Sequence, residues 1–395
     1  MKQTLFVTLA AAFMGSCGKT IKKIFGEPTP HEAYAEVLDD NNLDRTPEGR
    51  AWLAAAAYAL SQPHPIQVPY KQVGYFAPDK PRALGLQFHA GIGQRLIFTL
   101  NEKGPAPMTL FADVYEATPS GSTHLLAADT ALNEFYFDVP QTGTYLLRLQ
   151  PQLAQSGSYQ LSVAVGPSLQ FPVSDAKAKA GSFWGATRDG GKRSHQGVDI
   201  FAPKGSPAVA AADGYITGVG ENELGGKVVW MRPHGKNYTL YYAHLDKQLV
   251  QPGQQVKTGD AVGTVGNTGN ARNTPAHLHF GIYTFQGAVD PWPFVNKAVK
   301  TAKPLAEKNL AGSLVLTKTV RSQSGAALVP QTTVVPLAFN NQGYIAESAA
   351  GERLTVPVAS AKLQPATTAV VQGGQSKTEL KQERRVRTSS SEPGF

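Results

Sequence analysis

Five residues between positions 195 and 279 have the types and spacing expected of a site for metal-dependent hydrolysis. Four are histidines and one is an aspartate: His195, Asp199, His244, His277 and His279. Zn2+ in hydrolases takes three protein ligands from imidazole nitrogen and carboxylate oxygen, and it leaves a fourth position open. The cluster therefore predicts one Zn2+ ion, with His195, Asp199 and His279 suited to hold it.

Two short motifs within this cluster predict different local structures. His277 and His279 alternate with apolar residues, as on a β-strand, where residues two apart project to the same face. Gly197 lies between His195 and Asp199, and its missing side chain allows the backbone to pass close to a metal or to turn sharply. Either motif alone could be a surface pair. Four of the nine histidines fall in such contexts within one segment, and this concentration favours a metal site.

The amino terminus has the pattern of an export signal. Its apolar run, residues 5–14, is too short to span a bilayer as a mature helix. Met14-Gly-Ser-Cys17 resembles the bacterial lipobox, although that pattern prefers leucine at Met14. We therefore expect a signal peptide over residues 1–16 and a lipid anchor on Cys17; the alternative is plain secretion with an incidental cysteine. By resemblance to enterobacterial lipoproteins, Gly18 implies the outer membrane, facing the periplasm.

Charge and composition limit the partners of the chain. Its 395 residues carry a formal net charge of +8, which favours anionic surfaces such as the lipid phosphates and wall carboxylates of a bacterial envelope. The sequence has no basic helix or aromatic-basic strand motif of the kind that reads nucleic acid, so we expect no nucleic-acid partner. No apolar stretch after the signal is long enough to span a membrane.

The first half of the chain divides into three predicted segments. We expect a tether over residues 17–27 and a helical segment over residues 28–65, in which Thr46 caps the second helix. From residue 66 to residue 166 the hydrophobic pattern has a period of two, in at least six short runs separated by Gly, Pro and Ser turns. This number of strands predicts a β-sandwich-like domain.

The second half begins with the block that holds all the candidate site residues. That block, residues 171–297, is strongly β-patterned. After a linker, short strand patterns over residues 311–365 predict a small β module. Residues 366–395 are rich in Thr, Gln, Ser, Lys and Arg and cannot bury a core, so we predict a disordered tail.

Several motifs together resemble the lysostaphin/LytM-type peptidoglycan metalloendopeptidase family. They are His195-Gln-Gly-Val-Asp199, Tyr242-Ala-His244-Leu245, Gly266-Asn-Thr-Gly269 and His277-Leu-His279-Phe280. The resemblance implies a mainly β fold: a two-layer antiparallel β peptidase domain, preceded by the β-sandwich-like domain and short N-terminal helices, and followed by the small β module. It also implies that His195, Asp199 and His279 hold zinc, and that His244 and His277 are catalytic.

The function implied by this resemblance is hydrolysis of peptide cross-links in bacterial peptidoglycan. Zinc would polarise the scissile carbonyl and acidify a water, while His244 and His277 orient that water, accept its proton or stabilise the oxyanion; which histidine does which is open. Tyr242 lies two residues before His244, so on a regular strand it shares the same face and is a possible groove residue; a packing tyrosine is the alternative. Gly281 stands where many family members have glutamate, and residues 270–274 lengthen the usual loop.

Two other functions stay open. One is a catalytically inactive family member that activates a cell-wall amidase, but such proteins have lost ligand residues and all five positions are filled here. The other is an unrelated HxH enzyme, such as a metallo-β-lactamase-like hydrolase, which needs aspartate where Gly281 stands. The bond cleaved is also open: resemblance implies D-alanyl to diaminopimelate, whereas other relatives cut glycine bridges. We further hypothesise that residues 28–165 partly cover the groove.

Overall fold

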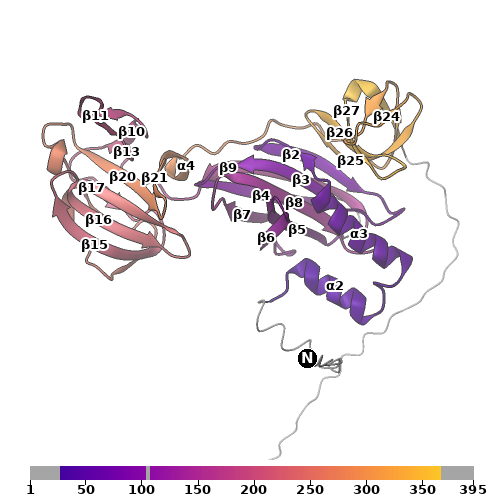
Figure 1. Ribbon diagram of the computed structural model, residues 1–395, viewed down its shortest axis with the longest axis horizontal. Helices are drawn as coiled ribbons and strands as arrows, with labels where there is room; N and C mark the ends of the chain where they lie inside the picture. The colour runs from indigo at the N-terminus through magenta and orange to yellow at the C-terminus, as the bar shows by residue number, and fades with distance from the viewer. Residues whose placement is uncertain (1–26, 104–106, 366–395) are drawn as a thin grey trace, which may run out of the picture.

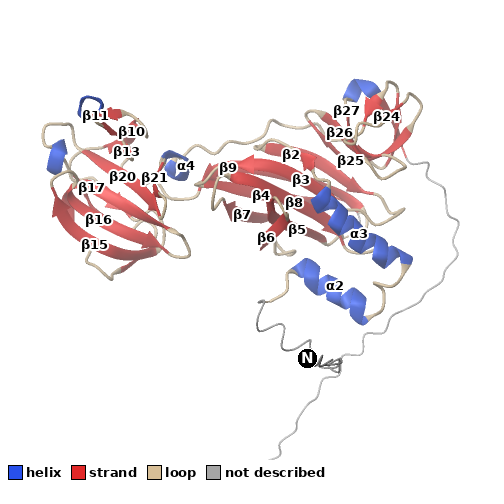
Figure 2. Ribbon diagram, viewed as in Figure 1, coloured by secondary structure: helices blue, strands red, loops and turns tan. Residues whose placement is uncertain are grey.

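The computed structural model describes residues 27–103 and 107–365. The signal peptide, Cys17 and the predicted tail lie outside the described residues, so those predictions are not addressed by the structure. In the described part the chain is mainly β, as the sequence predicted (Figure 2). No helix of this part has both the length and the apolar character needed to cross a membrane.

Two sheets packed face to face form a sandwich that begins at residue 64 (Figure 1). One sheet has the order β1-β3-β8-β5-β6, and the other contains β2, β9, β4 and β7. Apolar side chains from both sheets share one core, in which the Phe88 and Phe98 rings lie 6.3 Å apart. The strands are β1 (His64–Pro65), β2 (Tyr70–Phe76), β3 (Leu84–Ala90), β4 (Gln94–Lys103), β5 (Leu110–Thr118), β6 (Gly121–Ala127), β7 (Glu134–Asp138), β8 (Gly143–Pro151) and β9 (Gly157–Pro167).

Two capped helices precede the sandwich. α2 (Pro30–Asp40) and α3 (Pro47–Ser61) each have proline at the first position and a threonine cap, Thr29 and Thr46, whose side chain accepts a backbone N–H of the first turn. α3 packs on β3 and β8, and its Trp52 is only 1% exposed. The predicted helices are therefore packing elements of the sandwich.

The carboxy-terminal strands extend the second sandwich sheet. β25 (Thr333–Asn340) pairs with β2, and β26 (Gly343–Glu347) and β27 (Arg353–Val356) continue the sheet outward. At this junction the buried Glu347 carboxylate accepts a hydrogen bond from Arg82 at 3.1 Å and pairs with the buried Arg353. The sequence pattern predicted a separate small β module here. It could not predict the pairing of β25 with β2, because a contact between residues more than 250 positions apart leaves no local signal. The remaining elements are β22 (Gly312–Leu316), β23 (Val320–Arg321), β24 (Ala327–Leu328), η3 (Val358–Ser360) and β28 (Ala361–Pro365).

A second body, built around a ten-stranded sheet, contains all the candidate site residues. Its main path runs β10-β13-β20-β17-β16-β15-β18, with every pairing antiparallel, and β14 and β19 pair beside it. The elements are β10 (Lys179–Ser182), β11 (Thr187–Arg188), η1 (Asp189–Gly191), β12 (Arg193–Ser194), β13 (Val198–Phe201), β14 (Pro207–Val209), β15 (Gly214–Asn222), β16 (Gly226–Pro233), β17 (Tyr238–Gln248), β18 (Gln255–Val256), β19 (Ala261–Val265), η2 (Gly269–Ala271), β20 (His277–Thr284), β21 (Gly287–Val289) and α4 (Trp292–Val295).

Strand alternation gives this sheet a core face and an open face. Leu278 and Phe280 of β20 are fully buried in the core, whereas His277 and His279 project from the opposite face. β13 and β20 pair antiparallel with Asp199 directly opposite His279. The register therefore places the aspartate and the HxH motif on the same open face.

Candidate active site

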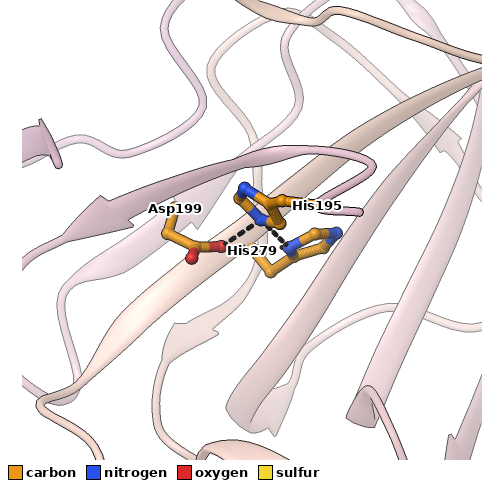
Figure 3. Close-up of side chains that lie close together, drawn as sticks. All are labelled: His195, Asp199 and His279. Carbon is orange, nitrogen blue, oxygen red and sulfur yellow. Dashed lines mark hydrogen bonds and ion pairs between the residues drawn. The ribbon is translucent and has the colours of Figure 1, made fainter. Parts of the chain in front are cut away.

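Three side chains converge on the open face of the sheet (Figure 3). His195 precedes β13, Asp199 lies in β13, and His279 lies in β20. His195 Nε2 lies 2.9 Å from Asp199 Oδ1 and 3.0 Å from His279 Nδ1. His279 Nδ1 is also 3.0 Å from Asp199 Oδ1. The three atoms thus form a nearly equilateral triangle.

This triangle has the composition and size of one face of a zinc coordination shell. Tetrahedral ligands at zinc distances of about 2.0–2.2 Å are separated from one another by about 3.3–3.6 Å. The three atoms therefore need to move apart by only a few tenths of an ångström. Two imidazole nitrogens and one carboxylate oxygen are also a common donor set of hydrolytic zinc sites. The residues present fit a zinc ion.

Surrounding contacts fix which atoms of the ligand residues face the centre. His195 Nδ1 donates to the Phe183 carbonyl at 2.9 Å, because a carbonyl only accepts, and this leaves Nε2 as the lone-pair atom. Arg188 Nη2 donates to Asp199 Oδ2 at 2.8 Å and to Ser182 Oγ at 2.6 Å. The guanidinium thereby engages one carboxylate oxygen and leaves Oδ1 for the centre.

Electrostatics keep these groups in the forms that a metal needs. Burial opposes ionisation of Asp199, but the contacts with His195 and His279 outweigh it and hold the pKa of the carboxyl well below its usual range. Burial lowers the pKa of the His279 imidazole, and this effect exceeds the opposite effect of the neighbouring Asp199 carboxylate. An ionised Asp199 beside a neutral His279 is the state that binds a cation.

Of the two alternatives predicted at Gly197, close passage of the backbone or a sharp turn, the structure shows a close passage, against His279 and Phe280 of β20. A Cβ at this position would lie 2.4 Å from His279 Cε1 and 2.8 Å from the Phe280 carbonyl oxygen. Only glycine fits against the ring of the ligand here. Gly197 therefore sets how closely the His195 segment approaches β20.

His244 and His277 lie beside the triangle and face the same space. Their ring centroids are 5.0 Å apart, and the His244 centroid is 5.9 Å from that of His279. His244 Nδ1 donates to the Thr268 carbonyl and His277 Nδ1 to the Pro275 carbonyl, each at 2.9 Å. In its neutral form, each ring therefore carries its proton on Nδ1 and presents an unprotonated Nε2. Burial, followed by the two neighbouring histidines, lowers the pKa of His244 to about 4, which keeps it neutral near pH 7.

A β-bulge in β17 overturns the prediction for Tyr242. Lys227 of β16 pairs with Leu245, but Val229 pairs with Tyr242, so β17 has one extra residue between these pairs. His244 lies in this bulge with φ of 60°, and its side chain reaches the open face out of the regular alternation. Tyr242 instead points into the core, is fully buried, and accepts the Ala211 N–H at 3.0 Å. It is therefore not a groove residue.

Comparison with known proteins agrees with this arrangement. Residues 193–291 match the family model described as Peptidase family M23. The chain belongs to peptidase family M23. Among its relatives, the peptidoglycan DD-endopeptidase ShyC of Vibrio cholerae serotype O1 is 41% identical over 88 residues, which are 22% of this chain and 20% of ShyC. The uncharacterized lipoprotein YgeR of Escherichia coli strain K12 is 40% identical over 106 residues, 27% of this chain and 40% of YgeR.

The chain spans only part of the length of these curated relatives. The chain covers less than half the length of ShyC or YgeR. The solved catalytic domain of the antimicrobial peptidase lysostaphin from Staphylococcus simulans is 33% identical, and the match covers 29% of this chain and 90% of that domain with a TM-score of 0.27. The sandwich and the carboxy-terminal strands lie outside the matched residues 193–291.

The five predicted histidine and aspartate residues line one groove of the M23 domain, with a volume of about 670 Å³. Other residues of its wall were not predicted from the sequence: Arg188, Arg193, Trp230, Tyr241 and Tyr283. Tyr241 could not have been found from the period of its strand, since the bulge at His244 is what brings the odd rather than the even neighbours to the open face. The arginines carry no local pattern that separates them from surface residues.

The hypothesis that residues 28–165 partly cover the groove is wrong for the part of the chain that the structure describes. Every residue lining the groove lies between positions 182 and 283. The sandwich instead meets the M23 domain at another edge, where Lys236 Nζ contacts Asp138 Oδ2 at 2.9 Å and the Phe294 ring fills the space above Gly93. The groove is thus left open to a large substrate.

Proposed function

We propose that the chain is a zinc-dependent endopeptidase that hydrolyses peptide cross-links of bacterial peptidoglycan. One observation carries the proposal. Three atoms suited to zinc lie within 4.8 Å of one another, in the same groove as two histidines whose Nδ1 atoms are anchored to backbone carbonyls. This combination supplies a Lewis-acid site and two bases within a single open cleft.

The proposed division of labour follows from the hydrogen bonds of the site. His195, Asp199 and His279 would hold Zn2+, which when bound polarises a carbonyl and acidifies water. His244 and His277 accept a proton through Nε2 and return it to the leaving amine. Because each Nδ1 is anchored to a backbone carbonyl, the rings keep their orientation while Nε2 changes its protonation state.

The peptidoglycan substrate is proposed from the relatives and from the open groove. ShyC is named for its action on peptidoglycan, and it is 41% identical to this chain over 88 residues. The envelope location is proposed from the sequence of residues 14–17, and the lipoprotein name of YgeR supports it. We propose an outer-membrane lipoprotein anchored through Cys17 and facing the periplasm. Labelled palmitate should enter the wild-type protein and not Cys17→Ser; incorporation into both would contradict the anchor.

The competing role, an inactive activator of a wall amidase, is disfavoured by the site itself. All five candidate residues are present, and each lies within 6 Å ring-to-ring or 3 Å atom-to-atom of another member. An activator does not need bases in its groove. It would also leave muropeptides unchanged when no amidase is added.

The test uses purified protein that lacks residues 1–17. It should hold about one zinc per chain and release cleaved peptides from cross-linked wall material, identified by mass spectrometry. His279→Ala should lose both properties. His89→Ala is the matched control, because His89 is an exposed histidine of the sandwich. Equal muropeptide profiles for the wild type and His279→Ala would rule out the enzyme.

A further inference from the structure

Three aromatic side chains form a cluster on the open face of the M23 sheet. Trp230 comes from β16, Tyr241 from β17 and Tyr283 from β20, three strands that lie side by side (Figure 1). Their ring centroids are 4.2 Å apart for Trp230 and Tyr241, 5.3 Å for Trp230 and Tyr283, and 6.0 Å for Tyr241 and Tyr283. Together with Val228 and Ala243 they form a small apolar cluster separate from the main core.

The cluster lies directly beside the candidate metal ligands. The Tyr241 ring is 6.0 Å from the His279 ring, centroid to centroid. Ala243 pairs with His279 across the two strands, and Tyr241 pairs with Gly281. All three aromatic residues line the same groove as the ligands. The aromatic surface therefore begins at the Tyr241–Gly281 pair, two residues along each strand from the pair that contains the candidate ligand His279.

The chemistry of this surface is apolar and its shape depends on Gly281. Burial raises the pKa of Tyr241, whose hydroxyl is engaged by Asn222, so it presents a neutral ring. A Cβ at position 281 would lie 2.9 Å from Tyr283 Cε2, which means that the Tyr283 ring rests in the space that a side chain would occupy. A larger residue at 281 would push this ring away from the metal site.

We propose that Trp230, Tyr241 and Tyr283 form a subsite for the aliphatic side chain of a substrate residue next to the scissile bond. The proposal rests on the proposed endopeptidase function. An extended peptide advances about 3.3–3.6 Å per residue, so a neighbour of the cleaved bond reaches a surface about 6 Å from the ligand ring. Covering one methyl group with aromatic rings favours an alanine-type residue over glycine by about tenfold. The groove therefore selects against oligoglycine bridges.

The test measures kcat/KM of the zinc-loaded full chain on matched soluble peptides. The peptides differ at one of the two residues that flank the cleaved bond, which is alanine in one member of a pair and glycine in the other. One pair tests each side of the bond. The wild type should prefer alanine on one side by tenfold or more. Trp230→Ala should reduce this preference to about twofold. Tyr283→Phe, which keeps the ring, should retain the preference.

Gly281→Ala gives a second route that does not depend on the folding of Trp230→Ala. It should move the Tyr283 ring and lower the preference for alanine, with the zinc content unchanged. If the wild type cleaves both peptides equally well, the subsite is refuted but the endopeptidase function stands. If the variants lose activity equally on both peptides, the rings have a structural role and the subsite is also refuted. If zinc-loaded wild type cleaves no peptide and no wall material, the proposed function itself fails.

Discussion

Adding one methyl group at Gly197 should disrupt the metal site without touching a ligand residue. In Gly197→Ala, the new Cβ would lie 2.4 Å from His279 Cε1 and 2.6 Å from His279 Nε2. Its third neighbour is the Phe280 carbonyl oxygen at 2.8 Å, which belongs to the backbone of β20. The clash therefore cannot be relieved by a flexible side chain alone.

The distances set the size of the effect. Cβ and the ring carbon are about 1 Å closer than ordinary van der Waals contact allows, so the His279 ring or the strand has to shift by about that amount. Overpacking of this kind costs about 1–3 kcal/mol of folding free energy. A displacement of about 1 Å in a group that positions reactants lowers the rate by about 100-fold. We expect zinc affinity to fall as well, because His279 Nδ1 moves away from the other two ligand atoms.

Three measurements test this prediction: zinc affinity by competition with a chelator, release of muropeptides, and thermal unfolding of the metal-free protein. Gly220→Ala is the control, since Gly220 lies in β15 of the same domain and a Cβ there has no neighbour within 4 Å. The control should match the wild type in all three. Wild-type zinc affinity and activity in Gly197→Ala would refute the view that close packing of this glycine positions the ligand.

Other substitutions test separate parts of the structure. Arg188→Met should lower zinc affinity about 10-fold or more in a chelator competition, because Asp199 loses the partner of Oδ2; unchanged affinity would contradict this role. Tyr242→Phe should leave peptide hydrolysis unchanged but reduce the free energy of unfolding in urea by about 1–3 kcal/mol, since the Ala211 N–H loses its acceptor. A loss of activity would instead indicate that Tyr242 is a groove residue. Burial lowers the pKa of His64 to about 4, below the ordinary value near 6.5, so its neutral form stabilises the fold fully above pH 6.5 and less as the pH falls toward 4. Between pH 7 and pH 4.5, the free energy of unfolding in urea should fall less in His64→Gln than in the wild type, by up to about 3 kcal/mol. Equal falls in the two proteins would contradict this prediction.

Much of the site could be predicted from local patterns. The alternation of His277 and His279 with Leu278 and Phe280 predicts a strand with two imidazoles on one face, and β20 has this form. The glycine between His195 and Asp199 predicts close backbone packing, and the ring of His279 lies against it. The same rule failed at Tyr242, because a bulge forms between two strands and is not encoded in the period of either one.

The sequence by itself determined the types of residue at the site, the β character of the chain, and the helical segment with the Thr46 cap of its second helix. These features follow from spacings of a few residues, where backbone geometry fixes which side chains share a face. Only the tertiary structure decided that His195 and His279, 84 positions apart, bring nitrogens to within 3.0 Å, and that β25 completes the sheet of the sandwich. Such contacts depend on the register of strand pairs and on loop closure over long separations, and neither leaves a periodic signal in the chain.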